Sequence, residues 1–153
     1  DPAGGSILAN CAPKGMPYLM TQPYPMEFVE QADRILLRIE EYDSDRTIYM
    51  ADALPAEGPP PSLLGYSVGH WENDTLVVHT SRVSYPHFNE SGVPQSEAME
   101  LVEYITTSDD ASRLDYKIVV TDPNTFSEPV VLEKSWVWLS GVSVEPYNCL
   151  VGD

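Results

Sequence analysis

Apolar and polar residues alternate along most of this chain, which is the pattern of β-strands. The alternation is clearest over residues 63–82 (LLGYSVGHWENDTLVVHTSR), where two alternating runs flank a polar break at residues 71–74. Two such runs on either side of a short break predict a β-hairpin. A second hairpin is predicted from residues 34–42 and 46–50, joined by a turn at residues 43–45.

Three later runs predict further strands at residues 99–107, 113–121 and 130–139, and residues 142–145 are a candidate for a short additional strand. The connections between the runs are too short to contain crossover helices. Antiparallel strands joined by hairpins form barrels or sandwiches. We therefore expect an all-β fold with little helix, either a single antiparallel β-barrel or a strongly curved sandwich of about 7–9 strands.

The first 25 residues differ from the rest because they contain five prolines and three glycines. Proline fixes φ and removes a backbone donor, so this spacing excludes a regular helix. Residues 51–62 and 84–97 are also rich in turn-forming residues and are expected to be loops. The expected organisation is an extended Pro-rich N-terminal arm, residues 1–25, laid over one β-barrel domain, residues 26–153.

The register of the hairpin at residues 63–82 is left open by its sequence. A three-residue turn places Tyr66 and Val68 on one face with Leu76 and Val78. A two-residue turn places Tyr66 and Val68 with Val77 and His79 instead. A slip of one residue exchanges the two faces of a strand, so the turn length decides which side chains point inward.

The charge balance is strongly acidic, with 24 Asp and Glu residues against 8 Lys and Arg residues and a net charge of −16. Phosphate backbones and anionic lipid surfaces repel such a chain, so we expect no nucleic-acid partner. No apolar run approaches the ~20 residues of a membrane-spanning helix, so we expect no membrane insertion.

Two cysteines, Cys11 and Cys149, lie near opposite ends of the chain in proline-containing segments. They form either a disulfide that ties the two termini together or two separate buried thiols, and we favour the disulfide, which requires an oxidising compartment. The chain begins at Asp1, as a secreted protein does after signal-peptide removal. We therefore expect a periplasmic or extracellular location.

Histidines and carboxylates provide the candidate chemistry. The three histidines, His70, His79 and His87, are weak candidates for a zinc or copper site because the first two lie on opposite arms of one hairpin. We expect no metal and no cofactor. Glu41 and Glu103 are in phase with apolar residues, and burial of a carboxylate raises its pKa toward the range of a general acid or base. The alternatives are that each glutamate is paired with a basic residue, namely Arg38, Arg46 or Lys134, or that it lies at a solvated barrel mouth.

Aromatic residues suggest a binding surface, since Trp136 and Trp138 share one face of a strand. In a barrel they line a pocket, and in a sandwich they belong to the core or to an interface. The weak catalytic candidates are Glu41, Glu103 and His79. The candidate ligand-binding residues are Tyr66, Trp71, His79, Glu103, Tyr116, Trp136 and Trp138.

Several long motifs occur in order along the chain: CAPKGMP (11–17), EEYDSDRTIYM (40–50), LLGYSVGHWENDTLVV (63–78), SGVPQSEAMELVEY (91–104), RLDYKIVVTDPNTFSEP (113–129) and PYNC (146–149). Together they resemble an exported bacterial family of small β-rich proteins without an established activity. The resemblance implies a similar exported domain with paired terminal cysteines, and it brings no catalytic residues. The chain departs from that pattern in having His70 and His79. Gly69-His70-Trp71 also resembles the G-x-W signature of lipocalins, but it lies mid-chain here.

Three functional hypotheses follow. The leading one is an exported, non-enzymatic domain that binds a small, mostly apolar or aromatic molecule. The second is an acid–base enzyme on the same barrel, either an isomerase, a lyase or a hydrolase. The third is an accessory subunit that docks on a larger assembly through its Trp136/Trp138 face or its proline-rich arm. The candidate partners are a small apolar or aromatic molecule, another protein, and a second copy of the chain in a homo-oligomer.

Overall fold

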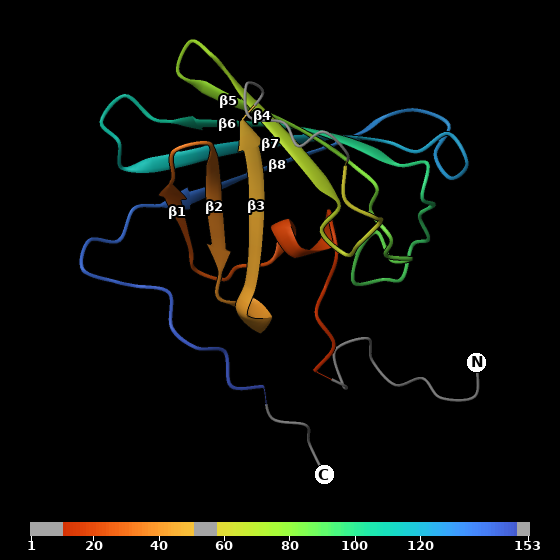
Figure 1. The fold of residues 1–153 in the computed structure, drawn as a ribbon, viewed down its shortest axis with the longest axis horizontal. Helices are drawn as coiled ribbons and strands as arrows, with labels where there is room; N and C mark the ends of the chain where they lie inside the picture. The colour runs from red at the N-terminus through yellow and green to blue at the C-terminus, as the bar shows by residue number, and fades with distance from the viewer. Residues whose placement is uncertain (1–10, 51–57, 150–153) are drawn as a thin grey trace.

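The computed structural model describes residues 11–50 and 58–149. In this part of the chain, eight strands follow one another in a single sheet that curls into a half-barrel (Figure 1). The strands are β1 (Met26–Glu30), β2 (Arg34–Ile39), β3 (Ser44–Met50), β4 (Tyr66–Glu72), β5 (Thr75–Ser81), β6 (Glu100–Thr107), β7 (Arg113–Thr121) and β8 (Val130–Val137). The expected all-β, strongly curved sheet is confirmed.

Neighbouring strands are antiparallel except for β3 and β4, which pair in parallel with Ile48 opposite Ser67. The expectation that every join is a hairpin is therefore wrong at this place. The connection between Met50 and Tyr66 is long enough to return the chain to the end of the sheet where β3 began, as a parallel pair requires. Part of this connection, residues 51–57, lies outside the described residues.

The sheet does not close, and β1 and β8 are its two edge strands in the strand order. Figure 1 shows β1–β3 running across the direction of β5–β8, so that the two halves enclose a concave side. The 3-10 helix η1 (Tyr18–Thr21) lies on this concave side. A second 3-10 turn, η2 (Glu41–Asp43), joins β2 to β3.

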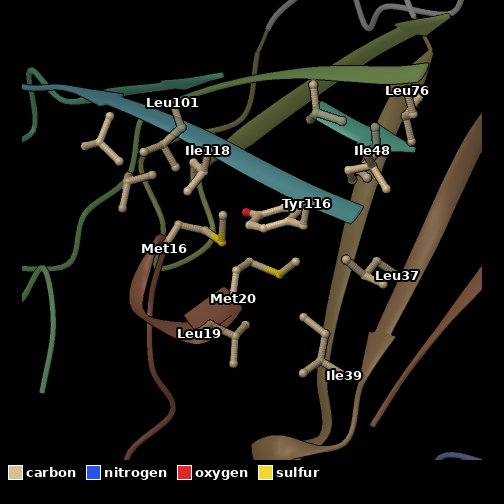
Figure 2. Close-up of a cluster of buried hydrophobic side chains, with 14 of the residues drawn as sticks. Met16, Leu19, Met20, Leu37, Ile39, Ile48, Leu76, Leu101, Tyr116 and Ile118 are labelled. Carbon is tan, nitrogen blue, oxygen red and sulfur yellow. The ribbon is translucent and has the colours of Figure 1, made fainter. Parts of the chain in front are cut away.

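The N-terminal segment corrects the expectation of an extended arm. Its residues 14–20 are all buried, and Met16, Leu19 and Met20 belong to the same core cluster as the inward residues of the strands. Figure 2 shows the Met16 and Met20 side chains directed toward Tyr116 and Ile118, with Leu19 on the far side of Met20. Apolar side chains between the prolines therefore fill the concave side, and we call residues 14–20 the plug.

The β4–β5 hairpin has a two-residue turn, Asn73-Asp74, because Glu72 pairs with Thr75. Asn73 adopts a positive φ of 54°, which this residue tolerates well. Ser67, Gly69, Leu76, Val78 and Thr80 consequently point into the core, whereas Val68 and His79 pair on the convex face. The open question of register is thus answered in favour of the two-residue turn.

Other bounds follow the alternation closely. β7 has the predicted bounds, and β8 ends two residues before the predicted end. Residues 142–145 form no strand, and β1, which follows Pro25, was not anticipated. Neither 3-10 turn of the described residues has the length or hydropathy of a membrane-spanning helix.

Candidate functional site

A buried ion pair lies in the middle of the half-barrel. Arg46 on β3 and Glu103 on β6 are 1 % and 0 % exposed. The Arg46 guanidinium donates from Nη1 to Glu103 Oε2 over 2.8 Å and from Nη2 to Oε1. Two inward positions on strands far apart in the sequence meet because the sheet curls, and the geometry is the bidentate one that arginine favours.

Hydroxyl groups complete this pair. Tyr116 donates to Glu103 Oε2 over 2.7 Å, and Arg46 also donates to Ser67 Oγ and Thr80 Oγ1. Burial raises the pKa of Tyr116, and the Glu103 charge adds to this. Burial alone would lower the pKa of Arg46, but Glu103 more than offsets it, so the guanidinium stays charged. Both carboxylate oxygens of Glu103 are therefore occupied by protein donors. This pairing is the alternative that the sequence left open for Glu103.

The second buried carboxylate, Glu41, is less completely paired. It lies in η2, is 1 % exposed, and one oxygen, Oε1, accepts a hydrogen bond from Lys14 of the plug. Lys14 also donates to Gln22 Oε1 over 3.1 Å and lies over the Tyr18 ring. The other oxygen, Oε2, has no hydrogen-bond partner among the described residues. Lys14 was missed as the partner because it lies in the proline-rich segment.

Burial raises the pKa of Glu41, and the Lys14 ammonium only partly opposes this. Burial also raises the pKa values of Tyr18, Tyr42 and Tyr85, with the Glu41 charge contributing to each. These phenols therefore remain protonated donors at neutral pH. The site is a carboxylate beside protonated phenols, and one of its oxygens accepts no hydrogen bond from residues 11–50 and 58–149.

The C-terminal segment crosses the body next to this site. Glu145 N donates to Glu40 Oε1 and Tyr147 N donates to Asp43 Oδ1, each over 3.0 Å. The Tyr147 ring packs against Tyr24 and Tyr42. The Cys11–Cys149 disulfide confirms the predicted pairing and ties this segment to the residues just before the plug.

The histidines do not converge. His70 and His79 stack on the convex face with ring centroids 6.0 Å apart, whereas His87 lies in the loop after β5 beside Tyr85. In residues 11–50 and 58–149, no group of three His, Cys, Asp or Glu side chains is arranged to hold a metal ion.

The seven candidate ligand-binding residues are distributed over different surfaces. Tyr66 and His79 lie on the convex face, and Glu103, Tyr116 and Trp136 lie on the concave side. Trp71 and Trp138 are 56 % and 73 % exposed. The structure therefore does not bring these residues together around one pocket.

Most of the exposed large apolar residues in the described part of the chain lie on β8 and the residues that follow it. Val137, Trp138, Leu139 and Val142 are each more than half exposed, as is Val131 earlier on β8. We call β8 together with residues 138–142 the β8 surface. The alternating pattern predicted the strand and placed Trp136 and Trp138 on the same face. In the structure, however, Trp136 is half-buried and Trp138 is exposed.

Two shallow depressions lie elsewhere on the surface. One, of about 520 Å³, lies between the β4–β5 and β6–β7 turns and is lined by Trp71, Asn73, Asp74, Thr107, Ser108 and Asp109. The other, of about 340 Å³, lies over β6–β8 and includes Tyr104, Lys117 and Glu133. Both are wide open to solvent, unlike the deep, mostly apolar pockets that enclose small ligands.

Comparison with known proteins gives this chain no relatives: no family model, no curated protein and no solved structure matches it. The resemblance to an exported bacterial family therefore stays a prediction.

Proposed function

We propose that this protein is a non-enzymatic docking module of a larger protein assembly, located in the periplasm or outside the cell. The observation that carries the proposal is the end of the β8 surface, where Val137, Trp138 and Leu139 follow one another and are each more than half exposed. Contiguous exposed apolar residues on a soluble domain are typical of protein–protein contact sites. The disulfide supports the location, since such bonds persist in oxidising compartments.

The interior gives less support to the hypothesis of a bound small molecule. The plug occupies the concave side, where a barrel that binds a ligand would hold it. Arg46 and Glu103 form hydrogen bonds with each other and with neighbouring protein groups. Docking through the outer surface requires neither group to be reached by a ligand.

Charge supports the choice of surface. Residues 129–144 contain only two charged side chains, Glu133 and Lys134, so this stretch is neutral in a chain of net charge −16. The cores of protein interfaces are depleted of charged residues and enriched in aromatic ones. The β8 surface has both properties.

Site-specific photo-crosslinking tests the proposal. A photoreactive residue replaces Leu139 in one variant and Trp71 in a control variant, since Trp71 is exposed but lies on the β4–β5 hairpin. In the native host we expect one discrete adduct from position 139, identified by mass spectrometry as a single protein and lost when Trp138→Ser is added. No adduct from position 139, or equal adducts from both positions, would overturn the proposal.

A further inference from the structure

The two edges of the sheet differ in how well they are protected from pairing with another strand. β1 has five residues, follows Pro23 and Pro25, and carries Glu27 and Glu30. Short length and charged side chains prevent edge strands from pairing. β8 has eight residues and a single pair of opposite charges, and like β1 it directly follows a proline, Pro129. The sheet therefore has one blunted edge and one open edge.

The hydrogen bonds of β8 identify which backbone groups are available at the open edge. Trp138 N donates to Ser112 O over 2.8 Å, and the register Arg113↔Val137 places these two residues opposite each other. In an antiparallel ladder, alternate residues direct both N–H and C=O to the same neighbour. Even-numbered residues of β8 thus face β7, and Val131, Glu133, Ser135 and Val137 direct their N–H and C=O groups away from it.

We propose that the partner of the β8 surface is a second copy of this chain, with the two β8 strands paired antiparallel about a two-fold axis at Ser135. This inference rests on the proposed docking function and names its partner. The pairing extends the sheet across the axis and satisfies the outward amides of both copies. An isologous contact of this kind uses the same residues on each side and closes on itself.

The position of the axis at Ser135 follows from the charges of β8 and from the length over which the two β8 strands overlap. An axis at Glu133 or at Lys134 would place that charge opposite its own copy, which is unfavourable in a sheet. An axis at Leu132 gives the same overlap within β8 but leaves the exposed Val137 and Trp138 without a β8 residue opposite them, and an axis beyond Ser135 shortens the overlap. The axis at Ser135 places Lys134 opposite the partner's Trp136.

The same register covers the exposed apolar side chains. Val131 lies opposite the partner's Leu139, and Glu133 lies opposite the partner's Val137. On the concave side, Leu132 lies opposite the partner's Trp138. Directly opposed side chains are about 4.5–5.5 Å apart at Cβ, close enough for these pairs to pack.

The salt dependence of the affinity distinguishes pairing with a second copy from binding to a basic protein. Two chains of net charge −16 repel one another at long range, and salt screens this repulsion while leaving the neutral β8 contact intact. The dimer is therefore expected to strengthen as salt is raised. A complex with a basic protein would weaken instead.

Cysteine crosslinking provides the decisive experiment. Ser135→Cys adds one thiol to a chain whose two native cysteines are bonded to each other, and Ser91→Cys is the matched control at an exposed loop serine. Residues on the axis have Cα atoms about 5.5 Å apart, within the span of a disulfide. We expect Ser135→Cys to form a covalent dimer of twice 17.0 kDa under mild oxidation, and Ser91→Cys to stay monomeric.

A second variant tests the edge without relying on a thiol. Ser135→Pro removes an N–H that points away from β7, so it leaves the β7–β8 ladder intact and removes hydrogen bonds of the dimer. By analytical ultracentrifugation we expect the wild type to dimerise more tightly with added salt and Ser135→Pro to be a folded monomer.

Each alternative outcome overturns a specific claim. A wild type that stays monomeric at every salt concentration, with no crosslink at position 135, refutes the second copy. If position 139 then still crosslinks to one different protein, the docking function survives without this inference. A dimer unaffected by Ser135→Pro refutes the β8–β8 contact, and open-ended oligomers refute the two-fold axis.

Discussion

Removing the charge of Arg46 is expected to be among the most damaging single substitutions in this protein. Arg46→Met keeps the length of the side chain but leaves Glu103 as an unpaired carboxylate that is 0 % exposed. Breaking a buried ion pair by removing one partner costs about 3–5 kcal/mol, because the remaining charge is not compensated. Total stability of a domain is only about 5–15 kcal/mol, so the variant should be close to unfolding.

The hydrogen bonds around the ion pair determine how much stability the milder substitutions are expected to cost. Tyr116→Phe removes one of the three donors to Glu103 and leaves Arg46 in place. A hydrogen bond to a charged group contributes about 1.5–3 kcal/mol, and we expect a loss in that range. Replacing both charges, in Arg46→Met with Glu103→Leu, should recover most of the loss of Arg46→Met alone, since no buried charge then lacks a partner.

Equilibrium unfolding in urea, followed by tryptophan fluorescence, measures these differences. The Trp136 ring lies 5.3 Å from that of Tyr116, and it contributes to the fluorescence together with the exposed Trp71 and Trp138. Leu132→Ala, a half-buried residue of β8, serves as a control for ordinary loss of packing. If Arg46→Met costs less than about 1 kcal/mol, or if the double variant is no more stable than Arg46→Met alone, the ion pair is not the central element that its burial indicates.

Two further predictions concern the plug and Glu41. Gly15→Ala would bring a Cβ to 2.5 Å from Tyr85 Cβ and 2.7 Å from Leu63 O, so we expect a loss of about 1–3 kcal/mol in urea unfolding. Gly58→Ala meets only the flexible end of Arg82 and should cost less; equal costs would contradict the close packing of the plug. Folding raises the pKa of Glu41 above 4.5, so its protonation stabilises the folded protein. This contribution to the free energy of unfolding is fully present below pH 4.5 and is lost as the pH rises through the folded-state pKa. When the pH is lowered from 7 to 5, the wild type should therefore gain stability relative to Glu41→Gln. A Glu41 titration midpoint at or below pH 4.5, measured by carbon NMR, would refute this.

Local alternation predicts individual strands well but says little about how they are joined. β7 was predicted with its observed bounds because nothing interrupts its alternation. The direction of β4 relative to β3 was missed, since a strand alternates in the same way in parallel and antiparallel pairs. β1 was missed because it has only five residues and follows a proline.

Burial of the polar groups was predictable in part. Glu103 is in phase with the apolar residues of β6, and it is buried as expected. Glu41 is also buried, but it lies in a 3-10 turn beyond the end of β2. Its partner, Lys14, was not predictable because tertiary packing, and no periodic pattern, places the plug beneath the sheet.

The N-terminal segment first fills the concave side of the sheet and then continues into the edge strand β1. Its residues 14–20 fill the concave side, and Pro23 and Pro25 then lead directly into β1. A β1 edge that accepted the β8 of another copy would produce a head-to-tail contact, which forms open filaments unless the rotation closes a ring. Because β1 is the shorter edge strand and carries two glutamates, we expect pairing at β8. Strand addition to this sheet is thereby limited to one closed contact.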